Sequence, residues 1–597
     1  MRPILAAVVM AIILAGGTPA LAQEVTAVNS ADIISSIDAL ARDGQLFITW
    51  DEAAAPEGAH LKAYLSHEPI TAGTLAATTV AAEWLELRSG RDWWQDPLSF
   101  ISPKASNFAD FMAPYGGTPP EPVGFVIEPG GEPVNPAGGL FVHTVTEATQ
   151  GPLYAAVTVV LADGRELADV VAGVNSLAAP VEAALAPPQA IFVGQGEPLP
   201  AGSGQGRPLV IRMHGRGGGH TAGANAMSVN YLMFGDTRQG WREGLAQKFM
   251  VTIADAAVYV TLSNRQWTGG RPVLESGDGR DHCPAINNFY YGYNSRIYET
   301  THTEQTIVPN YTEEQILAVV RWAEGTLGAD PNRTHLSGGS MGGSGGVSLA
   351  MHHPGVFEYV YAHVPAVAYL PGANLNRLEC FSGPLDETAV TGEGVPFIEH
   401  MNGIIQARRP GVDLPFIWMQ SGRADKSIAW VNNPPFYRAM NEARQALVAY
   451  WSGGEHGTAI ADMPKDRFIP SPDKFRRDTS YIVFSNNSDN RDPGEGDPAD
   501  GDVVGWINRG IDWTDIVDEP DQYAVTVQQT YEGIQYPITV DITPRRVQQF
   551  TVKPGDTVSA TVGSDAPRAI TVDEYGLITV PGVRIEDAAG TRVVVRR

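Results

Sequence analysis

The run Gly338-Gly339-Ser340-Met341-Gly342 restricts the possible folds of this chain more than any other segment. A short strand is predicted before it, over Thr334–Leu336, and a helix after it, over Val347–Met351. A serine between a strand and a helix, with small residues on both sides, is the context that a nucleophile elbow requires. The chain contains 64 glycines, so the run alone would be weak evidence, and a glycine-rich loop without chemistry is the alternative. The strand–turn–helix context favours a reactive Ser340.

Strands and helices alternate on both sides of this turn. Apolar strands are predicted at Leu209–Met213, Val258–Leu262 and Phe416–Met419. A helix is predicted at Thr312–Leu327, where a Thr-x-x-Gln capping box marks its start. This alternation predicts an α/β fold with a mainly parallel sheet, which we assign to residues 208–485.

A second glycine-rich run, from His214 to Gly219, directly follows the first of these strands. An oxyanion loop belongs at this place in a fold with a nucleophile elbow. Glycines let backbone N–H groups approach a substrate oxygen closely, so we expect oxyanion donors from the backbone of Met341 and of Arg216. A phosphate-binding loop is the alternative, but the run lacks the G-x-x-x-x-G-K-[ST] pattern.

An aspartate and a histidine follow the predicted strands Phe416–Met419 and Leu447–Trp451. Asp425 comes a few residues after the first of them and can orient a histidine and stabilise its cation. His456 follows the next strand and can accept the proton of Ser340 and return it to a leaving group. The alternatives are Asp386 or Asp413 as the acid, and a purely structural role for His456.

Residues of about 205–465 resemble the α/β-hydrolase superfamily, nearest to esterases of the feruloyl-esterase and polyhydroxyalkanoate-depolymerase kind. The order Ser340, Asp425, His456 matches that superfamily. The resemblance implies an α/β-hydrolase core, a serine carboxylesterase that forms an acyl-enzyme on Ser340, no cofactor, and an ester substrate, with polymer-linked and polyester substrates among the candidates. Its motifs are His214-Gly215, Asp330-Pro331-Asn332-Arg333, Gly338 to Gly343, Asp425 and His456.

Two other functions stay open at this point. Prolyl-oligopeptidase-type peptidases share the layout, although this chain lacks a recognisable propeller. A polysaccharide-binding protein with a vestigial hydrolase core is the third hypothesis, and the complete candidate triad argues against it. Neither the acyl and alcohol parts of the substrate nor the oligomeric state follows from the sequence.

The regions outside the α/β core are predicted to be β-structure. Residues 23–185 resemble a fibronectin type III module, with Trp50 near the early core and Tyr154 late in the fold. A plain module needs about 100 residues, so the Pro-, Gly- and Trp-rich stretch at 88–138 is predicted as an insertion. The remaining predicted parts are a linker at 186–207, an acidic Gly/Pro-rich connection at 486–518 and a sandwich-like β domain at 519–597.

The first 22 residues are predicted to be a signal peptide. Arg2 supplies the basic end, Ile4–Leu14 form an apolar run, and Ala20-Leu21-Ala22 fits a cleavage site. The run is too short to span a bilayer, and no other stretch is predicted to span one. We therefore expect a soluble mature protein that starts near Gln23, in a periplasm or outside the cell.

Two weaker patterns suggest binding sites. Trp267, Tyr290, Tyr291 and Tyr293 could line an aromatic substrate pocket, although core packing is the more common fate of such residues. The loop at 486–502 carries five aspartates, which suit Ca²⁺, but the spacing fits no EF-hand, and a solvated acidic loop is the alternative.

Charge and cysteine content limit the partners and the cross-links. The formal net charge is -26, which repels phosphate backbones, so nucleic acid is not an expected partner. The chain has 2 cysteines, Cys283 and Cys380. In an exported protein they could form a disulfide or remain two buried thiols.

Overall fold

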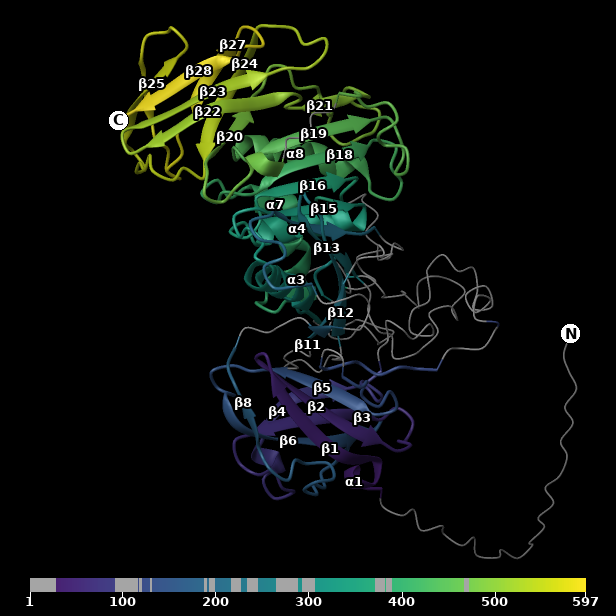
Figure 1. Cartoon of the computed structure of the whole chain (residues 1–597). Coiled ribbons are helices and arrows are strands. Elements are labelled where there is room, and N and C mark those ends of the chain that lie inside the picture. The colour runs from purple at the N-terminus through teal and green to yellow at the C-terminus, as the bar shows by residue number, and fades with distance from the viewer. Residues whose placement is uncertain are drawn as a thin grey trace, which may run out of the picture.

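The computed structural model forms three successive regions along the chain: an N-terminal β region, a central α/β region and a C-terminal β region (Figure 1). The predicted signal peptide, Cys283 and Cys380 lie outside the described residues. The structure describes residues 28–91, 116, 121–128, 131–186, 191–192, 199–215, 227–233, 245–264, 288–292, 306–370, 382, 389–466 and 472–597.

The N-terminal region consists of two antiparallel sheets that share one apolar core. Its strands are rich in β-branched and aromatic residues, which pack well on a pleated surface. Residues 86–138 separate β4 from β5, and much of the predicted insertion lies outside the described residues. One sheet has the order β1(Ile34–Arg42)-β2(Gln45–Glu52)-β5(Gly139–Thr144), and the other has the order β4(Thr79–Leu85)-β3(His60–Ser66)-β6(Gly151–Val160)-β7(Glu166–Leu167), with β8(Val181–Ala183) also paired to β6; the short helices α1(Ser30–Ile33) and η1(Leu75–Ala77) flank them.

The central region is built on a mixed ten-stranded sheet. Its middle strands, from β13 to β19, run parallel to one another, whereas the strands at both edges pair antiparallel. The predicted α/β core is therefore confirmed, with antiparallel edges added to its parallel centre. The sheet order is β21(Gly505–Ile507)-β19(Leu447–Ser452)-β18(Phe416–Gly422)-β16(Tyr359–His363)-β15(Thr334–Gly339)-β10(Leu209–Met213)-β13(Val258–Ser263)-β12(Leu245–Ile253)-β11(Met227–Met233)-β9(Ile191–Phe192).

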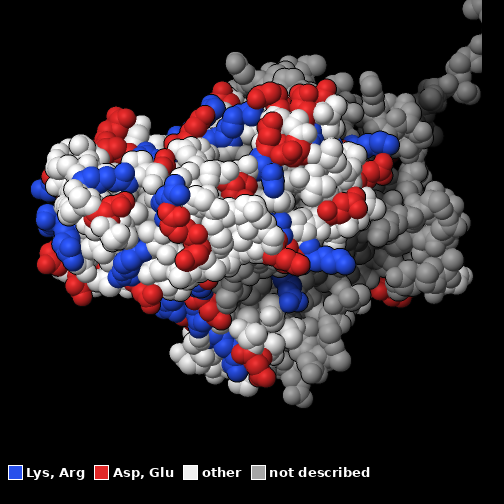
Figure 2. Space-filling view, turned by 90° about the horizontal axis from the view of Figure 1, so that it is seen from above, with Lys and Arg blue, Asp and Glu red and all other residues white. Residues whose placement is uncertain are grey.

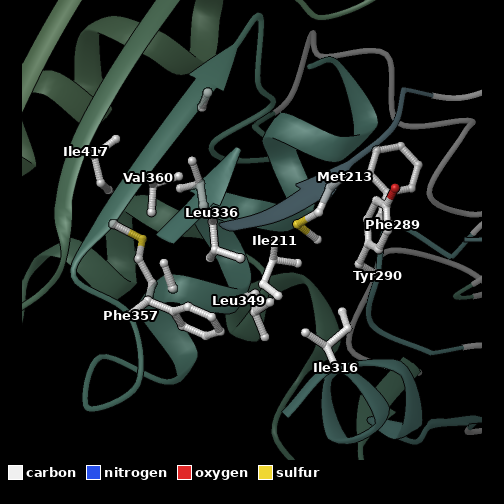
Figure 3. Close-up of a cluster of buried hydrophobic side chains, with 14 of the residues drawn as sticks. Ile211, Met213, Phe289, Tyr290, Ile316, Leu336, Leu349, Phe357, Val360 and Ile417 are labelled. Carbon is white, nitrogen blue, oxygen red and sulfur yellow. The ribbon is translucent and has the colours of Figure 1, made fainter. Parts of the chain in front are cut away.

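Helices cover one face of this sheet. The helix after Ser340, α4, packs on β10, β15 and β16 and lies in the centre of the core. Figure 3 shows Leu349 of this helix beside Ile211 and Leu336 of the sheet, with Ile316 of a second helix next to them. The helical elements are α3(Tyr311–Trp322), η4(Ala323–Leu327), α4(Met341–His352), α6(Phe397–His400), α7(Gly403–Ala407), η5(Trp430–Asn432), α8(Asn433–Glu442) and η6(Pro472–Lys474), and a small parallel pair is formed by β14(Thr306–Val308) and β17(Ala389–Thr391).

The C-terminal β region, rather than a second layer of helices, covers the other face of the central sheet at β16, β18 and β19. Successive side chains of a strand point to opposite faces, and this alternation separates two apolar clusters. Ile417 and Met419 of β18 belong to the helix-side core, whereas Phe416 and Trp418 belong to a core that continues into the C-terminal strands. The large side chains that the central sheet contributes to this second core are Tyr359, Phe416, Trp418, Val448 and Tyr450.

Two antiparallel sheets form the C-terminal region. β21 and most of β22 lie inside 486–518, the range predicted as a connection, and β21 pairs with β19 at the edge of the central sheet.

A buried arginine ties the C-terminal sheets to the central region. Arg545 pairs with Asp413 at 2.6 Å and donates to the carbonyl of Pro410 at 2.9 Å. The sheets have the orders β20(Tyr481–Ser485)-β24(Ile538–Arg545)-β27(Val580–Ile585) and β22(Ile511–Glu519)-β23(Gln522–Gln529)-β28(Thr591–Arg596)-β25(Thr557–Val562)-β26(Arg568–Thr571).

Figure 2 shows Lys and Arg side chains interspersed with Asp and Glu over the face that it displays. Mixed signs of this kind are typical of a solvated surface. Among the described residues, no helix is both long enough and apolar enough to cross a membrane.

A buried carboxylate is paired with two histidines at the far end of α4. Glu313 accepts from His352 at 2.8 Å and from His353 at 3.0 Å. Burial alone would raise the pKa of Glu313, but the two histidines hold it well below its usual value. Burial alone would lower the pKa of His352, but the Glu313 carboxylate raises it above its usual value. The folded state therefore favours the charged forms of both Glu313 and His352.

This pair should make stability depend on pH. The contribution of His352 is complete below its unfolded pKa of about 6.5 and is lost as the pH rises through its raised folded pKa. That of Glu313 is complete above about pH 4.3 and is lost as the pH falls through its lowered pKa. We expect Glu313→Gln to lower the free energy of unfolding by about 3 kcal/mol near pH 5.5, and by less near pH 9. Urea unfolding at the two pH values measures this, and a larger loss at the higher pH would contradict it.

Candidate active site

Ser340 stands in the sharp turn between β15 and α4, as the sequence predicts. Its backbone has φ 56° and ψ -121°, a conformation that residues other than glycine rarely adopt. The N–H of Ser340 donates to the carbonyl of His363 at the end of β16, at 2.7 Å. Ser344, one turn into α4, donates its hydroxyl to the carbonyl of Ser340 at 2.9 Å and accepts from the N–H of Ala366 at 2.8 Å. The strained turn is thus held from both sides.

The glycines on either side of Ser340 are required because the backbone segments approach closely. A Cβ atom at Gly338 would lie 2.4 Å from the carbonyl carbon of Gly342. A Cβ atom at Gly342 would lie 2.1 Å from the carbonyl oxygen of Met213, at the end of β10. Side chains at these positions would therefore force α4 away from the sheet.

Replacing Gly342 by alanine should push the start of α4 away from β10. We expect the free energy of unfolding to fall by about 1–3 kcal/mol, as in other overpacked cores, with a loss of ester turnover because Ser340 moves with the helix. Gly355→Ala is the matched control, because a Cβ atom there meets nothing within 4 Å. Thermal unfolding of both variants measures the effect, and equal stability of the two would refute the packing argument.

Asp425 and His456 meet Ser340 at the carboxyl ends of the parallel strands. The Oγ atom of Ser340 lies 2.9 Å from Nε2 of His456. Nδ1 of the same ring lies 2.6 Å from Oδ2 of Asp425. A carboxylate only accepts, so Nδ1 carries the proton and leaves Nε2 free to accept from the serine hydroxyl. The three predicted residues thus form one continuous hydrogen-bonded chain.

The carboxylate of Asp425 is fixed on its other oxygen. Oδ1 accepts from the N–H groups of Ser427 at 2.7 Å and Ile428 at 2.9 Å. The Asp425 side chain is 2% exposed, whereas that of His456 is 31% exposed. The acid is thus locked inside the protein, whereas the imidazole is partly exposed.

The candidate oxyanion loop starts next to Ser340. A Cβ atom at Gly215 would lie 3.4 Å from Cβ and 4.0 Å from Oγ of Ser340. Met341 is the first residue of α4, so its N–H belongs to the positive end of the helix. Arg216, the other predicted donor, lies outside the described residues.

His214 anchors this loop, a role that the sequence analysis did not assign to it. Its Nε2 accepts from the N–H of Asn264 at 2.9 Å, so Nδ1 carries the proton and donates to the carbonyl of Gly215 at 2.7 Å. Its own carbonyl accepts from the hydroxyl of Tyr290 at 3.0 Å. The one sequence feature that could have indicated this anchoring role is the position of His214, directly before the glycine-rich run.

The aromatic residues predicted to line a substrate pocket are placed differently. Tyr290 and Tyr291 are each 1% exposed and belong to the helix-side core, and Figure 3 shows Tyr290 beside Phe289. Tyr290 holds His214, and Tyr291 packs on Phe397. Trp267 and Tyr293 lie outside the described residues. The two described tyrosines are therefore buried in the core, and Tyr290 supports the site from there through its bond to His214.

The aspartates of the 486–502 loop bind the protein itself. Asp489 accepts from Gln529 at 2.9 Å and from Tyr531 at 2.7 Å, and Asp492 accepts from the N–H of Gly494 at 2.9 Å. No group of three or more metal-ligating side chains occurs in the part of the chain that the structure describes. Ca²⁺ binding by this loop stays a sequence-based hypothesis.

Comparison with known proteins places an esterase domain around this geometry. Residues 273–465, which contain Ser340, Asp425 and His456, match the model of the family described as "Putative esterase". All three residues of the hydrogen-bonded chain therefore lie in an esterase-like region. No curated protein sequence matches this chain.

Solved structures similar to this chain include esterases and peptidases. Thermogutta terrifontis esterase 2, phosphoramylated by tabun, has 15% identity over 43% of this chain and 75% of that chain, with a TM-score of 0.24. An S-formylglutathione hydrolase from Agrobacterium tumefaciens has 15% identity over 39% and 87%, with a TM-score of 0.26. Porphyromonas gingivalis dipeptidyl peptidase 4 has 13% identity over 51% and 39%, with a TM-score of 0.26. At such low identities and TM-scores, no statement about activity rests on these likenesses.

Proposed function

We propose that this chain is a secreted carboxylesterase that forms an acyl-enzyme on Ser340, with His456 as general base and Asp425 as its partner. The observation that carries the proposal is the hydrogen-bonded chain from Ser340 Oγ to His456 Nε2, at 2.9 Å, and from His456 Nδ1 to Asp425 Oδ2, at 2.6 Å. This arrangement of nucleophile, base and orienting acid is the one that acyl transfer requires.

In the first half of the reaction, Ser340 Oγ attacks the acyl carbon of the ester while its proton passes to Nε2 of His456. The carbonyl oxygen becomes an oxyanion, which we assign to the N–H of Met341 and to a backbone N–H of the loop after Gly215. His456 then gives the proton to the alcohol oxygen as the C–O bond breaks. The alcohol leaves, and the acyl group stays on Ser340.

In the second half, water attacks the acyl carbon and His456 takes a proton from it. The bond to Ser340 Oγ breaks, and the proton returns from His456 to the serine. The carboxylic acid leaves. Asp425 keeps its negative charge throughout and stabilises the imidazolium in both halves.

An ester panel tests the proposal. Mature protein that starts at Gln23 should hydrolyse nitrophenyl esters of short acids, and comparison with feruloyl, acetyl-sugar and polyester substrates would define the acyl and alcohol preference. A peptide panel under the same conditions should give negligible cleavage. Cleavage of peptides without ester turnover would overturn the proposal in favour of a peptidase. N-terminal sequencing of exported protein tests the secretion step, with Gln23 as the expected first residue.

A further inference from the structure

Arg423 is a buried cation only two residues before Asp425. It is 2% exposed and lies directly after β18, the strand that leads to the acid. An arginine is rarely buried unless hydrogen bonds compensate its lost hydration. The structure therefore needs a partner for this guanidinium, and Asp425 is not that partner, since its two oxygens bind His456, Ser427 and Ile428.

The partners of Arg423 are backbone carbonyls of the acidic loop at 492–502. Its guanidinium donates to the carbonyl of Asp502 at 2.5 Å, to that of Asp497 at 3.3 Å and to that of Asp500. The side chains of these three aspartates are exposed, so their carbonyls turn inward while their carboxylates face solvent. A planar guanidinium with five N–H donors can serve several carbonyls at once, whereas a lysine is a single point charge.

The segment of Arg423 is also tied to the segment that carries His456. The N–H of Arg423 donates to the carbonyl of Ser452 at 2.8 Å, and the N–H of Ala424 donates to that of Gly454 at 3.0 Å. Trp451, at the end of β19, donates its indole N–H to the carbonyl of Asp502 at 2.7 Å. The acidic loop thus contacts the carboxyl ends of β18 and β19, the two strands that lead to Asp425 and His456.

On the basis of the proposed function, we propose that Arg423 is a positioning residue for the Asp425–His456 pair and that the acidic loop is its counterpart. The loop lies between β20 and β21, outside the esterase-family match at 273–465. Part of the machinery that aligns the triad therefore comes from the chain beyond the matched domain. A displacement of about 1 Å at such a site can cost about 100-fold in rate.

The test changes each side of the contact between Arg423 and the acidic loop in turn. Arg423→Met removes the guanidinium. Gly501→Ala distorts the loop, because Gly501 has φ 68° and a Cβ atom there would lie 2.5 Å from the carbonyl oxygen of Asp492. For both variants we expect kcat on a nitrophenyl ester to fall about 10- to 100-fold with little change in KM.

Arg438→Met is the matched control. Arg438 donates to the carbonyl of Gly494 at 3.2 Å and pairs with Glu495 at 3.0 Å, so it holds the same loop, but it belongs to α8 and not to a triad-bearing segment. Its kcat should stay as in the wild type. Arg423→Lys should behave like Arg423→Met, because a single ammonium group cannot replace the planar guanidinium that donates to three carbonyls at once.

Counting active sites with a fluorophosphonate corrects every rate for the folded fraction. If Arg423→Met does not fold, Gly501→Ala in its exposed loop decides the question. Wild-type kcat in Gly501→Ala and in every folded Arg423 variant would overturn the inference. A wild-type protein that neither hydrolyses esters nor reacts with the probe would instead overturn the proposed function, so the two failures are distinguishable.

Discussion

Ser340→Ala should lower kcat on short nitrophenyl esters by about 10⁵- to 10⁶-fold, the range seen when the nucleophile of a serine hydrolase is removed. The expected cause is the loss of the only hydroxyl that is hydrogen-bonded to His456 Nε2 among the described residues. Alanine keeps the Cβ atom and removes only Oγ, so the turn with φ 56° and its packing should persist. Steady-state kinetics and thermal unfolding on the same preparation separate lost chemistry from lost folding.

Ser348→Ala is the control for this experiment. Ser348 lies on the same helix, two turns beyond Ser340, and is 9% exposed. It should keep wild-type turnover and react with a fluorophosphonate, whereas Ser340→Ala should show neither. Turnover of Ser340→Ala at more than about one hundredth of the wild-type rate would mean that another group is the nucleophile.

The candidate site could be predicted from sequence because each part of it is a local pattern. Ser340 stands between a strand and a helix, and Asp425 and His456 each follow a strand of the same parallel sheet. The carboxyl ends of parallel strands lie at one edge, so Asp425 and His456, which follow Ser340 by 85 and 116 positions, meet it there once the sheet forms. Chain order alone was enough to propose their roles.

The supporting contacts could not be predicted, because they depend on long-range packing. Arg423 looks like an ordinary loop arginine until the structure places the carbonyls of residues 497–502 around it. Tyr290 and Tyr291 look like pocket aromatics, yet both are buried in the core. The local sequence pattern shows neither whether these side chains are buried nor which groups they contact.

The relation between the central sheet and the C-terminal region was also beyond sequence analysis. A fully buried strand reads as a continuous apolar run, whatever covers its two faces. β18 is buried at every position, with Trp418 facing the C-terminal region and Met419 facing the helices. The sequence pattern therefore indicates that both faces are covered, but not that a β region rather than helices covers one of them.

Removal of residues 481–597 should consequently prevent the esterase domain from folding to a soluble, active form. The deletion would uncover the five large side chains of the central sheet that pack against the C-terminal strands, at a cost of about 1.5–3 kcal/mol for each side chain. The sum is comparable with the whole stability of a typical domain, about 5–15 kcal/mol. It would also remove β21 from the sheet edge and the acidic loop from Arg423.

The matched control removes the other flank. The N-terminal region has its own apolar core, which shares no residue with the two clusters of the central sheet. A chain that starts at Pro187, and so keeps β9 at the edge of the central sheet, should therefore stay soluble and hydrolyse nitrophenyl esters, while the C-terminal deletion should be insoluble or lack cooperative unfolding. Expression yield, thermal unfolding and turnover of the two truncations measure this. A soluble, active protein that ends at Ser480 would show that the C-terminal region is an appended module, whereas the shared core predicts that it is half of the catalytic fold.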